Sequence, residues 1–132
     1  MRLLLDENLP LSLRHEFQSP IDVVTVQYMR WKGRKNGELL GLMAMSGFDG
    51  IITADQRMYT DDVVRRFNLH FCLLRSRDTQ LDTLLPLVKQ LNMFLAEHHQ
   101  QLMQARTSRI VSTDGLADDE FTDGVHLAWV GS

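Results

Sequence analysis

Short apolar runs of strand length alternate with segments of helical periodicity along the first 80 residues of the chain. Four runs predict strands: Leu3–Leu5, Asp22–Val26, Gly50–Thr53 and His70–Leu74. Helical patterns occupy residues 8–17, 37–46 and 61–67 between them. This alternation predicts an α/β fold in which helices cover both faces of a mostly parallel sheet.

Polar residues mark the expected starts of two of these helices. Asn8 is expected to cap the first, which runs through Phe17 with Pro10 in its first turn, where a missing N–H costs nothing. Asn36 is expected to cap the second, which runs from Gly37 to about Ser46.

The pattern changes after the fourth strand. Asp78 opens the longest predicted helix, which continues to about Arg106 with apolar residues at helical spacing. Beyond it, Arg109–Thr113 and Val125–Val130 predict two strands that form an edge hairpin. With 132 residues and no linker, the chain is expected to fold as a single domain, residues 1–132.

Two carboxylates stand in equivalent places after predicted strands. Asp6 directly follows the first strand, and Asp55 follows the third. If these strands are parallel neighbours, both acids emerge at the carboxyl edge of the sheet, where open α/β folds place their ligand sites. Carboxylate oxygens are preferred ligands of Mg²⁺ and Mn²⁺, so the pair predicts a divalent-metal site.

Further polar residues could join this site. Asn36 and Glu38 lie at the start of the helix that follows the second strand, and they are expected to bind the ion directly or through water. Asp61 and Asp62 are candidates for groups that surround the ion without binding it directly. Taken singly, each of these residues also has an ordinary use as a helix cap or turn former.

Residues 28–35 combine four cations with two aromatic side chains. Arg30, Lys32, Arg34 and Lys35 suit contacts to the phosphates of RNA, and Trp31 suits stacking on a base. The alternative is a solvated basic loop in which Trp31 packs on the body of the protein as an anchor. The sequence leaves both interpretations open.

Charge and hydropathy limit the partners. The net charge is −3 and the pI about 5.9, but residues 1–112 hold all 14 basic residues against 12 acidic ones. A local basic patch is therefore compatible with RNA binding. No apolar run is long enough to span a membrane and no secretory signal pattern is present, so a cytoplasmic protein without membrane contact is expected.

The motifs occur in a recognisable order. They read Met1-Arg2-Leu3-Leu4-Leu5-Asp6-Glu7-Asn8-Leu9-Pro10, Val23-Val24-Thr25-Val26, Asn36-Gly37-Glu38-Leu39-Leu40 and Ile51-Ile52-Thr53-Ala54-Asp55. Over about residues 1–75 this resembles the PIN-like family of predicted toxin nucleases, which is related to the VapC-type ribonucleases. The resemblance implies a three-layer α/β/α fold, a Mg²⁺ or Mn²⁺ ion, endoribonuclease activity and a small antitoxin partner.

Two positions depart from the family pattern. Asn36 stands where relatives usually have an Asp, and Arg57 stands where they commonly have a second acid after the Thr-x-Asp segment. Both changes reduce the negative charge around the ion, so metal affinity should fall. Arg57 could instead neutralise a scissile phosphate, or it could occupy the place of the metal.

The function expected from the sequence is that of a metal-dependent endoribonuclease, the toxin of a toxin–antitoxin pair. Asp6, Asp55 and Glu38 are expected to hold the metal and, with Asn36, to form the catalytic set. Arg57 and the basic segment would bind RNA.

Two alternatives remain. The first is a catalytically weakened PIN-like protein that binds RNA or protein. The second, ranked last, is a receiver-type phosphoacceptor domain. Such a domain needs a Lys after a late strand, but no Lys lies between residue 36 and Lys89. A homodimer is a further expectation, because the long helix carries more apolar residues than one face needs to bury and Trp129 could join an interface.

Overall fold

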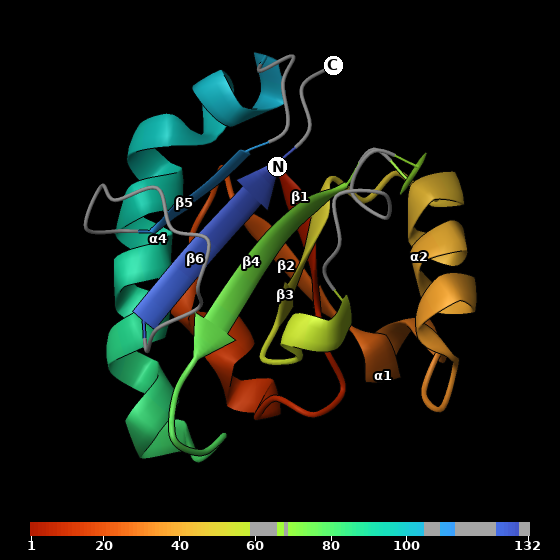
Figure 1. The fold of residues 1–132 in the computed structure, drawn as a ribbon, viewed down its shortest axis with the longest axis horizontal. Coiled ribbons are helices and arrows are strands. Elements are labelled where there is room, and N and C mark those ends of the chain that lie inside the picture. Colours follow the sequence, from red (N-terminus) through yellow and green to blue (C-terminus); the bar gives the residue numbers. More distant parts are fainter. Residues whose placement is uncertain (59–65, 68, 105–108, 113–123, 130–132) are drawn as a thin grey trace.

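The computed structural model describes residues 1–58, 66–67, 69–104, 109–112 and 124–129 of the chain. Six strands form one sheet: β1 (Arg2–Leu5), β2 (Asp22–Thr25), β3 (Gly50–Thr53), β4 (His70–Arg75), β5 (Arg109–Ser112) and β6 (Gly124–Trp129). Their order is β2-β1-β3-β4-β6-β5 (Figure 1). The first four strands in this order are parallel, and β6 runs antiparallel to both β4 and β5. The predicted α/β class, mostly parallel sheet and antiparallel edge pair are thus confirmed.

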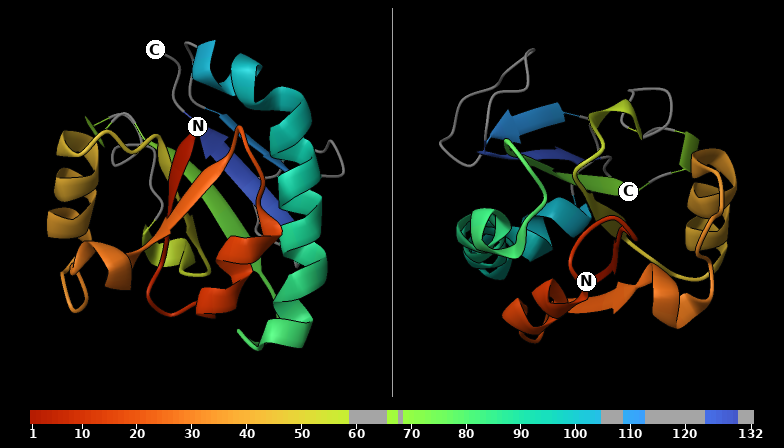
Figure 2. Two further views of the ribbon diagram at one scale, coloured as in Figure 1. Left: turned by 180° about the vertical axis from the view of Figure 1, so that it is seen from behind. Right: turned by 90° about the horizontal axis from the view of Figure 1, so that it is seen from below.

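Helices lie on both faces of the sheet. They are η1 (Leu11–Glu16), α1 (Val26–Met29), α2 (Asn36–Met45), η2 (Gln56–Met58) and α4 (Leu81–Gln104), of which η1 and η2 are 3₁₀-helices. One buried cluster joins the sheet to η1 and α4, and a second joins it to α1 and α2. Figure 2 shows α4 and α2 on opposite sides of the sheet. The chain therefore has the three layers expected of an α/β/α arrangement.

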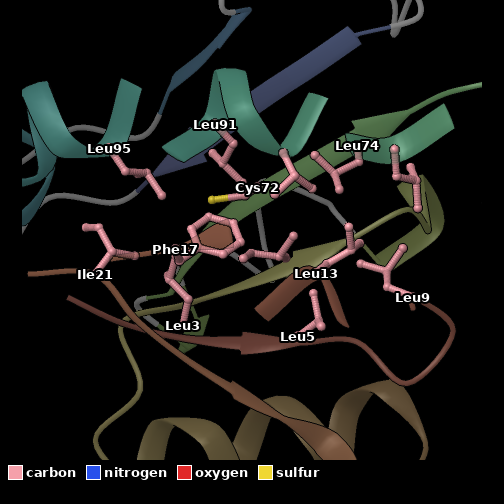
Figure 3. Close-up of a cluster of buried hydrophobic side chains, with 13 residues drawn as sticks. Leu3, Leu5, Leu9, Leu13, Phe17, Ile21, Cys72, Leu74, Leu91 and Leu95 are labelled. Carbon is pink, nitrogen blue, oxygen red and sulfur yellow. The ribbon is translucent and has the colours of Figure 1, made fainter. Parts of the chain in front are cut away.

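The pleat of β1 explains how one strand supplies two cores. Leu3 and Leu5 point into the cluster under η1 and α4, which Figure 3 shows, whereas Leu4 points into the cluster under α2. All three side chains are fully buried. A parallel strand that is covered on both faces has a continuous run of apolar residues in its sequence. The positions of β1 and β3 could therefore be predicted from the sequence.

Several element boundaries differ from those predicted. The first helix is a 3₁₀-helix that starts at Leu11, so Pro10 occupies the N-cap position and Asn8 lies before it. Asn36 is the first residue of α2, and its N-cap is Lys35, which makes no side-chain capping bond. The expectations that Asn8 caps the first helix and that Asn36 caps the second were therefore wrong. Most of the helix predicted over residues 61–67, with Asp61 and Asp62, lies outside the described residues.

Short elements at strand ends were not predicted. The second strand ends at Thr25, because the Thr25 hydroxyl accepts a hydrogen bond from the Tyr28 N–H at 3.0 Å and starts α1. The long helix spans Leu81–Gln104, and Asp78 accepts a hydrogen bond from Gln80 N–H just before it.

Within the described part of the chain, no helix is both long and apolar enough to cross a bilayer.

Gly50 lies where β3 leaves no room for a side chain against β4. A Cβ atom added at Gly50 would lie 2.5 Å from the His70 carbonyl oxygen and 2.9 Å from the His70 Cβ. We expect Gly50→Ala to push the two strands apart and to lower the free energy of unfolding by about 1–3 kcal/mol.

Gly41→Ala is the matched control for that substitution. Gly41 lies in the interior of α2, and among the described residues its added Cβ would meet only Phe67 Cε1, at 3.9 Å. Alanine favours helix over glycine, so this variant should gain up to about 1 kcal/mol. Chemical denaturation of both variants measures the difference, and equal stabilities would contradict the close approach of the strands.

Candidate metal and phosphodiester site

The register of β1 and β3 brings Asp6 and Asp55 to the same edge of the sheet. Leu5 pairs with Ile52 in the parallel register, and the Asp6 N–H donates to the Ile52 carbonyl oxygen at 3.0 Å. Thr53 ends β3, and Asp55 follows two residues later. The segments after β1 and β3 lie at the lower end of the sheet in Figure 1, where the arrowhead of β4 also points. The predicted parallel neighbours are confirmed.

Both carboxylates line one open pocket of about 250 Å³. Its other lining residues are Asn8, Ala54, Arg57 and Thr79. The pocket therefore combines two acids, one guanidinium, an amide and a hydroxyl. These groups can hold a cation and a phosphate side by side.

Asp6 is the buried member of the pair, with 6% of its surface exposed. Its Oδ1 accepts a hydrogen bond from the Glu7 N–H at 2.8 Å, and its Oδ2 accepts one from the Thr53 hydroxyl at 2.7 Å. Burial raises the pKa of Asp6, the two hydrogen bonds oppose that rise, and the negative charges of Glu7 and Asp55 add to it. Within the described part of the chain, no cationic side chain compensates for the burial of the ionised Asp6 carboxylate.

Thr53 connects the two acids. Its hydroxyl donates to Asp6 and also accepts a hydrogen bond from the Asp55 N–H at 3.0 Å. The side chain is buried in β3, with 1% of its surface exposed, so the hydroxyl has little freedom to turn away. One oxygen atom therefore orients the Asp6 carboxylate and fixes the backbone that carries Asp55.

Asp55 forms an ion pair with Arg57. The Oδ1 atom of Asp55 accepts hydrogen bonds from the backbone N–H of Arg57 at 3.0 Å and from its Nε at 3.1 Å. The Arg57 side chain is 88% exposed, and such exposed pairs contribute only about 0–1 kcal/mol. A cation or a phosphate entering the pocket can therefore displace this contact at small cost.

Asn36 and Glu38 do not line this pocket. Both are exposed at the start of α2, and Glu38 forms an ion pair with Arg34, which lies just before the helix. Among the described residues, no group of three or more His, Cys, Asp or Glu side chains lies close enough to hold one ion. The structure thus brings Asp6 and Asp55 together, but not Glu38.

The basic segment reaches the site through Glu7. The Gly33 N–H donates to both carboxylate oxygens of Glu7, each at 3.3 Å, and Gly33 has a positive φ of 81° that suits glycine. Arg30, Lys32 and Lys35 are exposed, whereas Arg34 pairs with Glu38. The tip of the loop is thereby held next to the residue that follows Asp6.

Trp31 packs inward. Its ring meets the ring of Phe48 edge to face at 5.8 Å, and it lies against the cluster under α2. This favours the interpretation of Trp31 as an anchor of the loop. Tyr28, by contrast, is 74% exposed.

Three residues of the site were missed in the sequence, namely Asn8, Thr53 and Thr79. Thr79 follows β4, the neighbour of β3, so the rule that selected Asp6 and Asp55 would have selected it as well. Thr53 gave no signal, because a Thr is common in a strand and its hydrogen bonds depend on the register.

The donor set fits a Mg²⁺ or Mn²⁺ ion. These ions are commonly bound by one or two carboxylates, with water and substrate phosphate completing the shell. Asp6 and Asp55 supply two hard oxygen ligands, and Asp6 carries a buried charge for which the described residues provide no cation. The presence of Arg57 on Asp55 reduces the net negative charge but leaves one oxygen of Asp55 without a hydrogen bond from the described residues.

Comparison of the chain with protein-family models, with curated proteins and with solved structures finds no match in any of the three. The assignment of function therefore depends on the chemistry of the site.

We expect Thr53→Val to weaken metal binding about 10- to 100-fold, a range typical when a group that orients a ligand is lost. The hydroxyl lowers the pKa of Asp6, so its loss should raise that pKa further and move the pH dependence of Mn²⁺ binding upward. Thr53→Ser, which keeps the hydroxyl, is the control. A titration of Mn²⁺ at several pH values measures both effects, and identical curves for Val and Ser would contradict the role of the hydroxyl.

Proposed function

We propose that this protein is a metal-dependent ribonuclease of PIN-like type. The observation that carries the proposal is the placement of Asp6 and Asp55 at one pocket, next to the Arg57 guanidinium. Open α/β folds place their ligands at the carboxyl ends of neighbouring parallel strands, which is where these two carboxylates lie. The order of the sequence motifs also resembles that of the PIN-like family. A toxin role with a small antitoxin partner, and a homodimeric state, are extensions of the same proposal.

Each residue of the pocket has a defined task in this proposal. Asp6 and Asp55 would hold the ion, and Thr53 would keep Asp6 in its orientation. When bound, Mg²⁺ or Mn²⁺ supplies Lewis-acid polarisation of a phosphodiester and of water. Arg57 would leave Asp55 and neutralise the phosphate, since an arginine fork matches phosphate geometry.

RNA is the substrate class that the surroundings favour. Arg30, Lys32 and Lys35 are exposed cations on a loop that Glu7 ties to the site. Contacts from such cations to a backbone are not specific for sequence but position the strand. Glu38 and Asn36 remain proposed catalytic residues only if α2 approaches the pocket when substrate binds.

Incubation of a labelled single-stranded RNA with the purified protein tests the proposal. We expect cleavage in millimolar Mg²⁺ or Mn²⁺ and none in excess chelator. Intact RNA under both conditions would refute the nuclease proposal.

A second candidate function is RNA or protein binding without cleavage. The Asp55–Arg57 pair favours it, because the guanidinium already neutralises one of the two carboxylates. RNA that is retained but left intact in the presence of metal would support this candidate.

A further inference from the structure

The exposed ring of Tyr28 lines a second pocket, which runs along the edge strand β2. This pocket has a volume of about 330 Å³ and is lined by all four residues of β2 together with Arg2, Arg14 and Tyr28. Its size lies at the small end of the range for small-ligand sites, about 300–1,000 Å³. We propose that it binds one unstacked nucleotide of a single-stranded RNA, with the base stacked on Tyr28. This inference rests on the proposed ribonuclease function.

The topology places the Tyr28 end of this pocket at the same edge of the sheet as the acids. Tyr28 lies on α1, directly after β2, and Asp6 lies directly after β1, the neighbour of β2. Figure 1 shows α1 at the same lower end of the sheet as the segment that follows β3. Because neighbouring strands are about 5 Å apart, adjacent nucleotides of one RNA strand can reach from the Tyr28 pocket to the Asp6 pocket.

Tyr28 is suited to stacking because its ring is not used by the fold. It is 74% exposed, whereas the other aromatic residue of the basic segment, Trp31, packs on Phe48. Single-stranded nucleic acids are bound by aromatic platforms of this kind beside cations that follow the backbone. Tyr28, rather than Trp31, is thus the ring available for stacking on a base.

The walls of the pocket offer polar groups to a nucleotide. The Asp22 N–H donates to the Met1 carbonyl oxygen, so the next residue of β2, Val23, turns its N–H and carbonyl away from β1. β2 is an edge strand of the described sheet, which leaves these two groups open to a base edge. The Asp22 carboxylate offers a further acceptor.

Charge on this side is also favourable for a phosphate. Arg14 lines the pocket from η1 and is exposed, and Arg30 follows Tyr28 by two residues and is exposed as well. Arg2 is already engaged, since it donates to the Ser46 carbonyl at 3.2 Å and covers the Phe48 ring at 4.4 Å. Its charge still counts, so among the described lining residues Arg2 and Arg14 carry two positive charges against the one negative charge of Asp22.

The test measures binding of a fluorescent eight-nucleotide single-stranded RNA in chelator, where no cleavage occurs. We expect Tyr28→Leu to weaken binding about tenfold or more, and Tyr28→Phe, which keeps the ring, to bind like the wild type. Met45→Ala is the matched control, because Met45 is also an exposed apolar residue, 87% exposed, and it lies at the far end of α2. Arg14→Gln should weaken binding by a smaller factor and reduce its salt dependence.

The outcomes separate this inference from the function on which it rests. Metal-dependent cleavage by a Tyr28→Leu variant that binds the RNA as tightly as the wild type would overturn the stacking site and leave the nuclease proposal intact. Equal losses in the Phe and Leu variants would also overturn it, because the ring would then not be the binding feature. Preferential binding of double-stranded RNA by the wild type would also overturn the stacking site, because paired bases are not free to stack on Tyr28. Absence of metal-dependent cleavage in the wild type refutes the nuclease proposal instead.

Discussion

Asp6→Asn should lower RNA cleavage more than about a hundredfold and leave the fold intact. Loss of a metal ligand removes several kcal/mol of stabilisation of the developing charge, and about 3 kcal/mol corresponds to a hundredfold change in rate. Asparagine has the shape of aspartate, and its carbonyl oxygen can still accept the hydrogen bond from the Glu7 N–H. Initial cleavage rates at saturating Mg²⁺ measure the effect.

The thermal stability of the same variant separates a lost ligand from a lost fold. The pKa of Asp6 is raised in the folded protein, so its ionisation costs stability as pH rises through that pKa. At pH 7 without metal, Asp6→Asn removes this cost and should melt at the same temperature as the wild type or higher. With millimolar Mn²⁺, only the wild type should gain stability, by about 2.7 kcal/mol when Mn²⁺ is at 100 times its Kd. A variant that cleaves RNA at the wild-type rate would refute the role of Asp6.

Acidification should destabilise the protein through His70. This residue starts β4 and is 8% exposed, and its Nδ1 has no hydrogen-bond partner among the residues that the structure describes. Burial lowers the pKa of His70 to about 4, and the nearby charge of Asp49 opposes this only in part. The folded protein is therefore more stable with His70 in its neutral form.

The sign of the pH effect follows from this lowered pKa. The unfolded chain binds the proton near pH 6.5 and the folded chain only near pH 4, so the contribution of His70 is complete above pH 6.5 and is lost as pH falls toward 4. The loss amounts to about 3 kcal/mol, since each pH unit between the two pKa values is worth about 1.4 kcal/mol. Denaturation curves at pH 8 and at pH 4.5 measure it.

His70→Phe provides the comparison for this effect. Phenylalanine keeps a planar ring in the same strand position but cannot bind a proton. The variant should lose much less stability than the wild type between pH 8 and pH 4.5. Parallel pH profiles for the two proteins would mean that His70 does not carry the acid sensitivity.

The strands could be predicted from the sequence where their burial requires a run of apolar residues. β1, β3 and β4 are covered on both faces and appear as apolar runs, and the pairing of Leu3–Leu5 with Gly50–Ile52 follows from the alternation of strands and helices. The helix start at Asn36 was misjudged, because an asparagine favours the N-cap but does not fix it. Short 3₁₀ segments such as η2 gave no periodicity to read.

The candidate site was predictable only along the strands. Asp6 and Asp55 follow from the rule that ligands gather at the carboxyl edge of a parallel sheet. Glu38 was predicted because it lies in the first turn of the helix that follows the second strand, from where it could project toward the crevice. Its carboxylate pairs instead with Arg34, four residues earlier in the chain. The roles of Thr53 and Glu7 depend on hydrogen bonds between segments 47 and 26 residues apart, for which the sequence holds no signal.

The central claim is that one divalent cation is shared by the acids that follow β1 and β3, and direct measurement of Mn²⁺ binding tests it most simply. Titration calorimetry on the wild type, Asp6→Asn and Asp55→Asn, with Gly41→Ala as a control away from the pocket, gives the number of ions per chain. We expect one ion per chain in the wild type and the control, and none in either Asp variant. Absence of binding in the wild type at millimolar Mn²⁺, or unchanged binding in both Asp variants, would contradict the claim.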